Sequence, residues 1–462
     1  MKKRKKANSD PFAHALPAFL QKKGSIINVG VAKPEGGAVP NIIFVKKEKR
    51  VEHKNKILYD RSDQTQPERR CLCSMNNNTT KLLGLKDVIV TKITDDGDSL
   101  YIDIELPRRM HKCPRCGIDT DRIHDYRTQR IKDLPTFGKR TYLLLKKRRY
   151  ACSCGKRFYE ENHFLPRYYR CTSRLIADLI NSFHELNSAS QIAREHNVSS
   201  STALRYFDNV SYGIKSLPHV LSIDEFKGNA DGEKYQTIVT NPMKKQVLDI
   251  LPNRYEPDLI SYFKSFNNRE NVHSFVTDMN PHFKRVAETC FPNAVIIADR
   301  FHVLRQVVWD MEKVRKHEQD KLSDKFRKYF KRSKSLLMKS RRKLTDEDKD
   351  KLAIMFNIAP RLARAYDLKN RFFKFMHCRS SQTGRKLLSH WLLLAQVEDL
   401  PEFEASITAC TNWSQEILNA LDYPWSNGFT EGCNNKIKVL KRVCFGVRNF
   451  KRFRNRILHC MS

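Results

Sequence analysis

Residues 220–224, Val-Leu-Ser-Ile-Asp, form an apolar run that ends in a carboxylate, and residues 272–278, Val-His-Ser-Phe-Val-Thr-Asp, repeat that pattern. A third carboxylate, Glu431, lies far downstream in a basic segment. Each acid alone favours a structural role, because acidic residues often end strands and cap helices. Their order and flanking strands, in a chain this basic, instead predict that Asp224, Asp278 and Glu431 converge on divalent metal ions.

The segment from residue 218 to residue 302 alternates strand-like and helix-like patterns. The expected order is strand, strand, strand, helix, strand, helix and strand, over residues 220–224, 237–240, 247–251, 257–266, 272–278, 281–290 and 294–299. This is the element order of an RNase H-like core, in which the first and fourth strands lie side by side. Asp224 and Asp278 should therefore be close in space, and Glu225 should point to the opposite side of its strand.

Phosphodiester cleavage and strand transfer need a nucleophile oxygen and a leaving oxygen in line, and two Mg²⁺ or Mn²⁺ ions about 3.5–4 Å apart stabilise both. We therefore assign Asp224, Asp278 and Glu431 as candidate catalytic and magnesium-binding residues. Asp299, which ends the next strand, is the rival second carboxylate. With His302 it forms an Asp-x-x-His pattern, predicted to be auxiliary and to orient a phosphate or the flanking strand. A helix N-cap and a packed core histidine are the plainer alternatives.

The composition predicts a polyanionic partner. Lys and Arg number 86 against 51 Asp and Glu in 462 residues, which gives a net charge of +35. A membrane is the competing polyanion, but no apolar run reaches the roughly 18 residues of a spanning helix. No signal peptide follows the opening MKKRKK, and nine of the 13 cysteines are scattered. We expect a reduced cytoplasmic setting, associated with the nucleoid in a bacterium or nuclear in a eukaryote, and no membrane.

Two short cysteine pairs predict a zinc site. The cysteines are Cys113, Cys116, Cys152 and Cys154. Thiolates at this spacing can surround one tetrahedral Zn²⁺, with the backbone turning at Gly117 and Gly155. Four thiolates leave no open position, so a structural zinc is predicted, with a redox pair or unpaired thiols as the alternative. His111 and His124 lie nearby and are expected to be ordinary polar or aromatic residues.

Helical periodicity from residue 170 to residue 215 predicts a helix-turn-helix. The turn is expected at Asn197 and Val198, with Ser199 or Ser200 capping the second helix. The residues expected to contact DNA are Ser201, Thr202 and Arg205 on that helix, and Lys436, Lys438, Lys441 and Arg442 after Glu431. An ordinary helical hairpin and a solvated basic helix are the alternatives.

No acid follows Glu431 up to residue 462, although basic residues are frequent there. This run, which includes Arg448, Arg452, Arg454 and Arg456, is predicted to follow a DNA backbone.

The fold class expected from these patterns is a multidomain α+β or α/β protein. Its segments are a disordered basic extension (1–75), a zinc-binding β-rich module (76–165), a helix-turn-helix (170–215), the first part of the core (218–302), an all-helical insertion (303–425) and the core completion with Glu431 and a basic tail (426–462). A plainer interpretation of the extension is that translation begins at Met75.

Several stretches carry a resemblance. They are HKCPRCG (111–117) with CSCGKRF (152–158), the helix-turn-helix, LSIDEFKG (221–228), VTDMNPHFKRVAETCFPNAVIIADRFHV (276–303) and SNGFTEGCNNKIKVLKRVCFGVRNFKRFRNRIL (426–458). From about residue 76 onward the chain resembles bacterial insertion-sequence transposases of the ISL-three family. The Cys-x-Cys pair, in place of Cys-x-x-Cys, departs from the family pattern.

The resemblance implies a DDE transposase whose catalytic triad is Asp224, Asp278 and Glu431. It also implies that the zinc and helix-turn-helix modules recognise terminal inverted repeats in double-stranded DNA, and that a homo-oligomer forms a synaptic complex with target DNA. Two alternatives stay open. One is a sequence-specific DNA-binding regulator with a repurposed core, and the other is an RNase H-like nuclease or resolvase without strand transfer.

Overall fold

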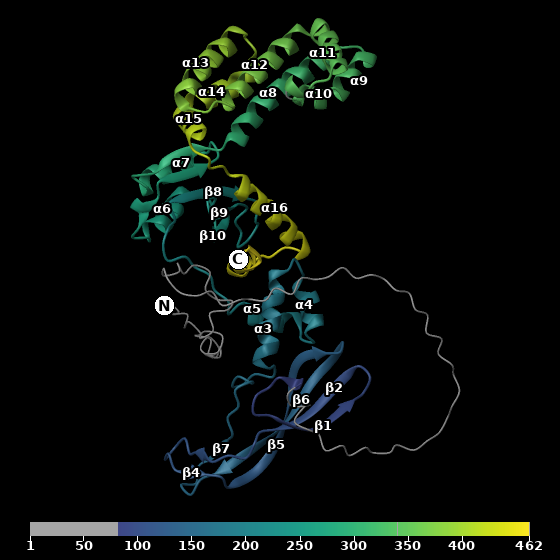
Figure 1. Cartoon of the computed structure of the whole chain (residues 1–462), viewed down its shortest axis with the longest axis vertical. Coiled ribbons are helices and arrows are strands. Elements are labelled where there is room, and N and C mark those ends of the chain that lie inside the picture. Colours follow the sequence, from purple (N-terminus) through teal and green to yellow (C-terminus); the bar gives the residue numbers. More distant parts are fainter. Residues whose placement is uncertain (1–81, 340, 462) are drawn as a thin grey trace, which may run out of the picture. The chain divides into compact units, whose positions relative to one another are not determined.

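The computed structural model of the chain describes residues 82–339 and 341–461 (Figure 1). The expected basic extension and the start proposed at Met75 lie outside the described residues. The described residues divide into two compact units, 82–176 and 177–461, with the boundary inside helix α3 (Ser173–Asn181). Among the described helices, none is long and apolar enough to cross a membrane.

The first unit is built on a five-stranded sheet of order β1-β2-β6-β5, with β7 pairing to β6. Its strands are β1 (Ile89–Asp95), β2 (Ser99–Glu105), β5 (Ile123–Thr136), β6 (Lys139–Ala151) and β7 (Arg157–Tyr159). The expected turn between the first two strands forms because the Asp95 and Asp96 carboxylates accept the N–H groups of Gly97 (2.9 Å) and Ser99 (2.7 Å). Strand β5 was not expected, because its sequence is mostly polar and shows no strand-like alternation. It forms a strand because it pairs along its length with the more apolar β6.

The second unit begins with the predicted short helices. Helix α4 (Ala189–Glu195) and helix α5 (Ser200–Phe207) are joined by a turn in which Asn197 has a φ of 52°. Ser199 caps α5 by accepting the N–H of Thr202 at 3.2 Å. Ile192 and Phe207 are fully buried between the helices, as their spacing predicted.

A second five-stranded sheet has the order β10-β9-β8-β11-β12. Its strands are β8 (Val220–Phe226), β9 (Gln236–Asn241), β10 (Gln246–Leu251), β11 (Ser274–Thr277) and β12 (Val295–Ala298). Strands β8 and β11 are parallel neighbours, which confirms the expected adjacency of the first and fourth strands. The helices that connect this segment are α6 (Glu256–Lys264) and α7 (Pro281–Cys290).

Side-chain alternation gives this sheet two buried faces. Leu221, Ile223 and Phe275 pack with α6 and α7 on one face. Val220 and Val276 point to the other face. The helices on that face are α15 (Ser414–Asp422), α16 (Gly428–Val443) and α17 (Phe450–Met461). Both faces are covered, so polar side chains on these strands lie between packed layers (Figure 1).

Between β12 and α16 every described element is helical. The helices are α8 (Arg300–Asp320), α9 (Asp324–Arg332), α10 (Lys334–Met338), η3 (Arg341–Lys343), α11 (Asp346–Ile358), α12 (Pro360–Met376), α13 (Ser381–Val397), η4 (Pro401–Phe403) and α14 (Glu404–Asn412), followed by α15. One apolar cluster runs through them, with Phe372, Phe375 and Trp391 among its buried aromatic residues.

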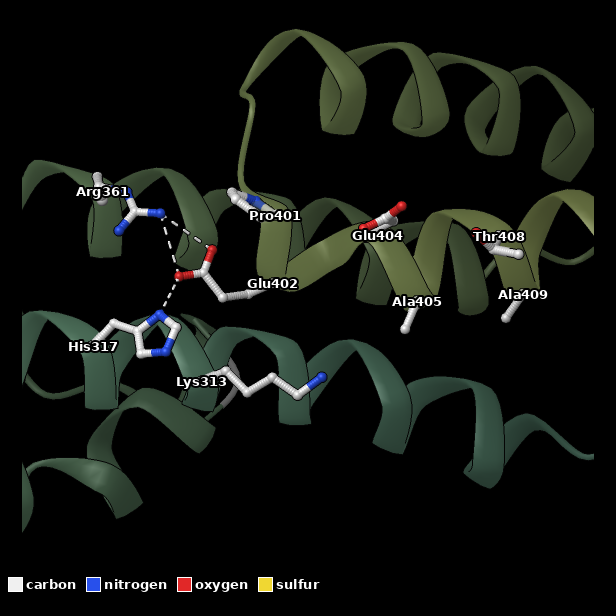
Figure 2. Close-up of a pocket in the computed structure, with 9 residues that line it drawn as sticks. All are labelled: Lys313, His317, Arg361, Pro401, Glu402, Glu404, Ala405, Thr408 and Ala409. Carbon is white, nitrogen blue, oxygen red and sulfur yellow. Dashed lines mark hydrogen bonds and ion pairs between the residues drawn. The ribbon is translucent and has the colours of Figure 1, made fainter.

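Glu402 joins three of these helices beside an open hollow (Figure 2). One carboxylate oxygen lies 2.7 Å from Nδ1 of His317 in α8, and the other lies 3.2 Å from the guanidinium of Arg361 in α12. Burial opposes ionisation, but the backbone N–H of Glu402, His317 and Arg361 outweigh it and lower the pKa of this carboxyl. His317, Arg361 and Glu402 therefore satisfy one another and stabilise the helical packing.

Helix α17 lies between the α4–α5 pair and the sheet, and its arginines bind groups of the protein. The guanidinium of Arg452 pairs with Asp208 at 2.5 and 2.7 Å. Arg456 is 3% exposed and donates to the carbonyls of Glu185 and Asn187, both at 2.8 Å. These side chains were expected on a DNA track. Their partners lie more than 200 residues earlier in the chain. The sequence therefore shows that these residues are basic, but it does not show that they pair with groups of the protein.

Two further side chains fix α17. Arg454 Nε donates to Asp249 Oδ1 at 2.6 Å, and the hydroxyl of Tyr262 donates to Asp249 Oδ2 at 2.8 Å. His459 is fully buried, and its Nε2 lies 2.8 Å from the carbonyl of Ile180. Burial, reinforced by the neighbouring His184, lowers the pKa of His459 to about 4, so this histidine is neutral at physiological pH.

We predict that Arg454→Ala lowers the free energy of unfolding by about 3 kcal/mol, because it leaves the buried carboxylate of Asp249 without its counter-charge. Urea unfolding followed by circular dichroism measures this change. Arg448→Ala is the matched control, since Arg448 is an exposed residue of the same basic run. The double variant Arg454→Ala/Asp249→Asn should recover part of the loss. Equal destabilisation by Arg448→Ala and Arg454→Ala would contradict the role given to this ion pair.

Candidate functional site

Asp224 and Asp278 lie side by side at the ends of parallel strands. The register pairs Val276 with Ser222, so the two aspartates continue that pairing on the sheet face that α16 covers. Burial, together with the negative charge of Asp278, raises the pKa of Asp224 to about 7. Burial also raises the pKa of Asp278. Two neighbouring carboxylates with raised pKa values require a cation or a proton between them.

Asp299 and His302 complete this end of the sheet. Asp299 occupies the N-cap position of α8, but its carboxylate makes no cap bond there. One oxygen instead accepts the backbone N–H of Asn427 at 3.0 Å, and the other lies 2.8 Å from Nδ1 of His302. This bond raises the pKa of His302. The imidazole also lies close enough to Asp224 and Asp278 to favour their ionised forms.

The first turns of α16 dock on the sheet through amides and hydroxyls. Ser222 and Thr240 contact the hydroxyl of Thr430 at 3.0 and 2.8 Å, and Ser222 also donates to the side chain of Asn427. All four residues are at most 1% exposed. A buried hydroxyl network tolerates little displacement of its members, so it fixes the register of α16 against the sheet.

Asn434 was missed as a site residue. Its Nδ2 donates to Asp224 Oδ2 at 2.9 Å, while its Oδ1 is buried and has no hydrogen-bond partner among the residues that the structure describes. An oxygen with an unused lone pair beside two carboxylates matches the ligand chemistry of Mg²⁺ or Mn²⁺. The Asn-Asn pair at 434–435, three residues after Glu431, was the available signal in the sequence.

Glu431 shares one stripe of α16 with Asn427 and Asn434. It follows Asn427 by four residues and precedes Asn434 by three, and those residues contact Asp299 and Asp224. The side chain is half-buried. Among the described residues, only the four cysteines form a group of three or more ligands within 4.8 Å of one another. The three carboxylates do not form such a group among the described residues.

The four cysteines predicted to bind zinc meet at one point in the first unit. Their sulfur atoms all lie within 4.8 Å of one another, with 3.6 Å between Cys113 and Cys154 and 3.5 Å between Cys116 and Cys152. Tetrahedral Zn²⁺ with Zn–S bonds of about 2.3 Å needs sulfur separations of about 3.8 Å. The set therefore fits a structural zinc, and the shorter Cys-x-Cys pair supplies its fourth ligand.

The backbone around the cysteines has the expected turns. Gly117 and Gly155 have φ values of 72° and 81°, and their N–H groups donate to the carbonyls of Cys113 and Cys152. Backbone N–H groups directed at its sulfur outweigh burial and lower the pKa of Cys113 to about 6. His111 is outside the cluster and stacks on Tyr150 at 4.5 Å, as an ordinary aromatic neighbour.

Some of the residues expected to contact DNA are exposed, and others bond to groups of the protein. On α5, Ser201 and Arg205 are exposed, while Thr202 belongs to the Ser199 cap. On α16, Lys436 donates to the carbonyl of Cys460 (2.5 Å) and Lys441 donates to that of Lys227 (2.6 Å). Of the four basic residues expected to contact DNA on this helix, Lys436, Lys438 and Arg442 are exposed.

Comparisons with known proteins cover both parts of the chain. A family model described as "Transposase" matches residues 221–457, and a model described as "zinc-finger of transposase IS204/IS1001/IS1096/IS1165" matches residues 109–154. The first range holds the three carboxylates, and the second holds the four cysteines.

Curated relatives include two named as transposases and one with a different name. The chain is 26% identical over 371 residues to the transposase for insertion sequence element IS1001 of Bordetella parapertussis, which covers 78% of this chain and 91% of that protein. It is 33% identical over 113 residues to the transposase for insertion sequence element IS1557 of Mycobacterium tuberculosis, 24% of this chain and 25% of that protein. A Lactococcus lactis protein named ATP-dependent protease is 33% identical over 101 residues, 22% of this chain and 31% of that protein.

We predict that Asp224→Asn makes the metal-free protein more stable at pH 8 but not at pH 4. A carboxyl whose folded pKa of about 7 exceeds its unfolded value takes up a proton on folding, so wild-type stability falls as pH rises between about 4 and 7. The gain at pH 8 should be about 2–4 kcal/mol.

Urea unfolding at several pH values, with zinc retained and no Mg²⁺ or Mn²⁺ added, measures the difference. Glu225→Gln is the control, because Glu225 faces Arg254 at 2.6 Å on the opposite side of the strand. If the free energies of unfolding of wild type and Asp224→Asn changed in parallel with pH, the charge of Asp224 would not destabilise the folded protein.

We also predict that Cys154→Ser lowers zinc affinity by at least about 100-fold, because tetrahedral closure needs all four thiolates. Zinc per purified chain, measured by elemental analysis after dialysis, reports the loss. Cys171→Ser is the matched control, since Cys171 is a buried cysteine of the same unit outside the cluster. Full zinc retention by Cys154→Ser would mean that Cys154 is not a ligand.

Proposed function

This chain belongs to the transposase family of the DDE type, and from that premise we propose that it binds the terminal inverted repeats of an insertion sequence, cleaves DNA at the element ends and joins the freed ends to target DNA. The observation that carries the proposal is the half-buried pair of Asp224 and Asp278 on adjacent parallel strands, where burial raises both pKa values. An enzyme has little reason to hold two carboxylates in this way unless cations and a phosphodiester meet there.

The sheet that carries the pair is proposed to be an RNase H-like core. Three antiparallel strands followed by two parallel ones, in the order β10-β9-β8-β11-β12, support this assignment. The helices from α8 to α15 then form an insertion between β12 and α16. This insertion separates Glu431 from the aspartates in sequence, while α16 returns it to the same face of the sheet.

We propose that Asp224, Asp278 and Glu431 hold two divalent cations. Bound there, the cations would stabilise the negative charge on the attacking and leaving oxygens of the phosphodiester. Asn434 holds Asp224 in place through Nδ2, and its unpaired Oδ1 faces the same site. Asp299 binds Nδ1 of His302 and raises the pKa of this imidazole, whose protonated form would donate from Nε2 to a phosphate oxygen.

DNA recognition is proposed for the small helices and the zinc module. Ser201 and Arg205 are exposed at α5, where a recognition helix presents its N-terminal side to the major groove. On α16, Lys438 and Arg442 supply positive charge beyond the catalytic end of the helix. Pairing of two element ends implies a homo-oligomer, which light scattering with and without end DNA can measure.

The proposal predicts metal-dependent cleavage and joining of duplexes that carry the repeats flanking the coding sequence. Asp224→Asn, Asp278→Asn and Glu431→Gln should each lower cleavage by at least about 100-fold, because each removes a negative ligand of the cations. Asp299→Asn and His302→Ala should lower it by about 10- to 100-fold, as groups that orient the site do. Gel electrophoresis of end-labelled DNA with Mg²⁺ or Mn²⁺ resolves both products.

Glu225→Gln, on the opposite side of β8, is the control and should cleave normally. Cleavage without joining would indicate a nuclease, and binding without cleavage would indicate a regulator. Full activity in the three carboxylate variants would overturn the assignment of the site.

A further inference from the structure

Phe445 is held in an unfavourable conformation at the end of α16. Its side chain is 91% exposed, the largest exposure among the large hydrophobic residues of the described ranges. Its φ is 54°, in the left-handed region that aromatic residues rarely adopt. An aromatic side chain in this position is costly in two ways, through exposure to water and through backbone strain.

The hydrogen bonds around Phe445 show why its backbone has this shape. The N–H of Phe445 donates to the carbonyl of Arg442 (3.1 Å), and the N–H of Gly446 donates to that of Lys441 (3.0 Å). These two bonds form a Schellman motif, in which the left-handed position normally holds glycine. Glycine is available one residue later, at Gly446, so helix termination alone does not explain a phenylalanine at 445.

The surroundings of Phe445 are basic. Lys438, Arg442 and Arg448 are exposed, and no acidic residue follows Glu431 in the sequence. A partner of this surface must combine negative charge with an apolar surface that can accept an aromatic ring. DNA offers both, in its phosphates and its stacked bases. A second copy of this chain is disfavoured as the partner, because two such basic surfaces would repel each other.

The position of Phe445 relative to the carboxylates is set by α16. Fourteen residues separate it from Glu431, which corresponds to about 21 Å along a helix. A duplex rises about 3.4 Å per base pair, so this length spans about six base pairs. DNA that is cut at the carboxylates and follows α16 would meet the phenylalanine within one helical turn.

We propose that Phe445 inserts its ring into the base stack of the bound DNA, about six base pairs from the cleaved phosphate. The inserted ring unstacks a base step and bends or opens the duplex there, while the arginines and lysines nearby hold its phosphates. The inference rests on the proposed DNA-end binding and adds a specific contact to it.

Two residues of the first unit show the same combination of exposure and strain. Phe137 is 83% exposed with a φ of 54°, and Tyr168 is 78% exposed with a φ of 68°. Both lie next to basic residues, Lys139 and Arg167 respectively.

The test compares Phe445→Asn with Phe445→Trp in the full-length protein. Asparagine tolerates the left-handed conformation and removes the ring, while tryptophan keeps a ring that can stack. We expect Phe445→Asn to have an unchanged or higher Tm, because strain is relieved. Its affinity for a duplex carrying the flanking repeats should fall by about 5- to 100-fold, and Phe445→Trp should bind nearly as wild type does.

The probe is that duplex with 2-aminopurine placed, one position at a time, about four to eight base pairs from the cleavage site. This range is centred on the distance that the length of α16 spans. Unstacking raises its fluorescence, so the wild type and Phe445→Trp should give a local rise that Phe445→Asn lacks. Val397→Asn is the control, because Val397 is an 80% exposed hydrophobic residue at the end of α13.

Three outcomes would overturn the inference. If Phe445→Asn gave the same fluorescence rise and the same affinity as the wild type, the ring would not contact DNA. The proposed end binding and cleavage would be unaffected by that result. A change of oligomeric mass in Phe445→Asn without DNA would assign the ring to a contact between copies. Failure of the wild type to bind or cut the duplex would overturn this inference together with the proposed function.

Discussion

The electrostatic cost of placing Asp224 next to Asp278 governs much of the second unit. Adjacent parallel strands put both carboxylates on a face that helices cover, where burial disfavours their charged forms. The surrounding structure compensates with polar groups. Asn434 donates to one carboxylate, and His302, whose pKa is raised by its bond to Asp299, lies near both. A site of this kind is poised to gain cations, because each bound cation removes repulsion that the protein alone leaves in place.

The attachment of α16 follows from the same constraint. A catalytic side chain on a separate helix must be positioned to within a fraction of an ångström, and apolar packing permits small slips. Here the hydroxyls of Ser222, Thr240 and Thr430 form a buried network with Asn427, whose backbone also binds Asp299. Directional bonds of this kind fix both the height and the rotation of the helix. These bonds hold the first turns of α16, where Glu431 lies, at a set position relative to the sheet.

Local patterns predicted the parts of this chain that depend on local physics. Apolar runs ending in aspartate marked β8 and β11, Pro281 marked the start of α7, and the cysteine spacing marked the zinc cluster. The partners of α17 were not predictable, because a run of arginines looks the same whether it meets phosphate or a buried carboxylate. Strand β5 and the role of Asn434 were missed for a similar reason, since each depends on a neighbour that is distant in sequence.

The buried position of α17 also determines when the second unit can finish folding during synthesis. Residues 450–461 fill the space between the α4–α5 pair and strands β9 and β10, which are made more than 190 residues earlier. Until that helix leaves the ribosome, the apolar surfaces of both partners stay open to solvent and to proteases. A polypeptide that stops short of residue 450 lacks the side chains of α17 that cover these surfaces, and its Asp249 lacks the guanidinium of Arg454. The second unit therefore completes its packing only after α17 has been made.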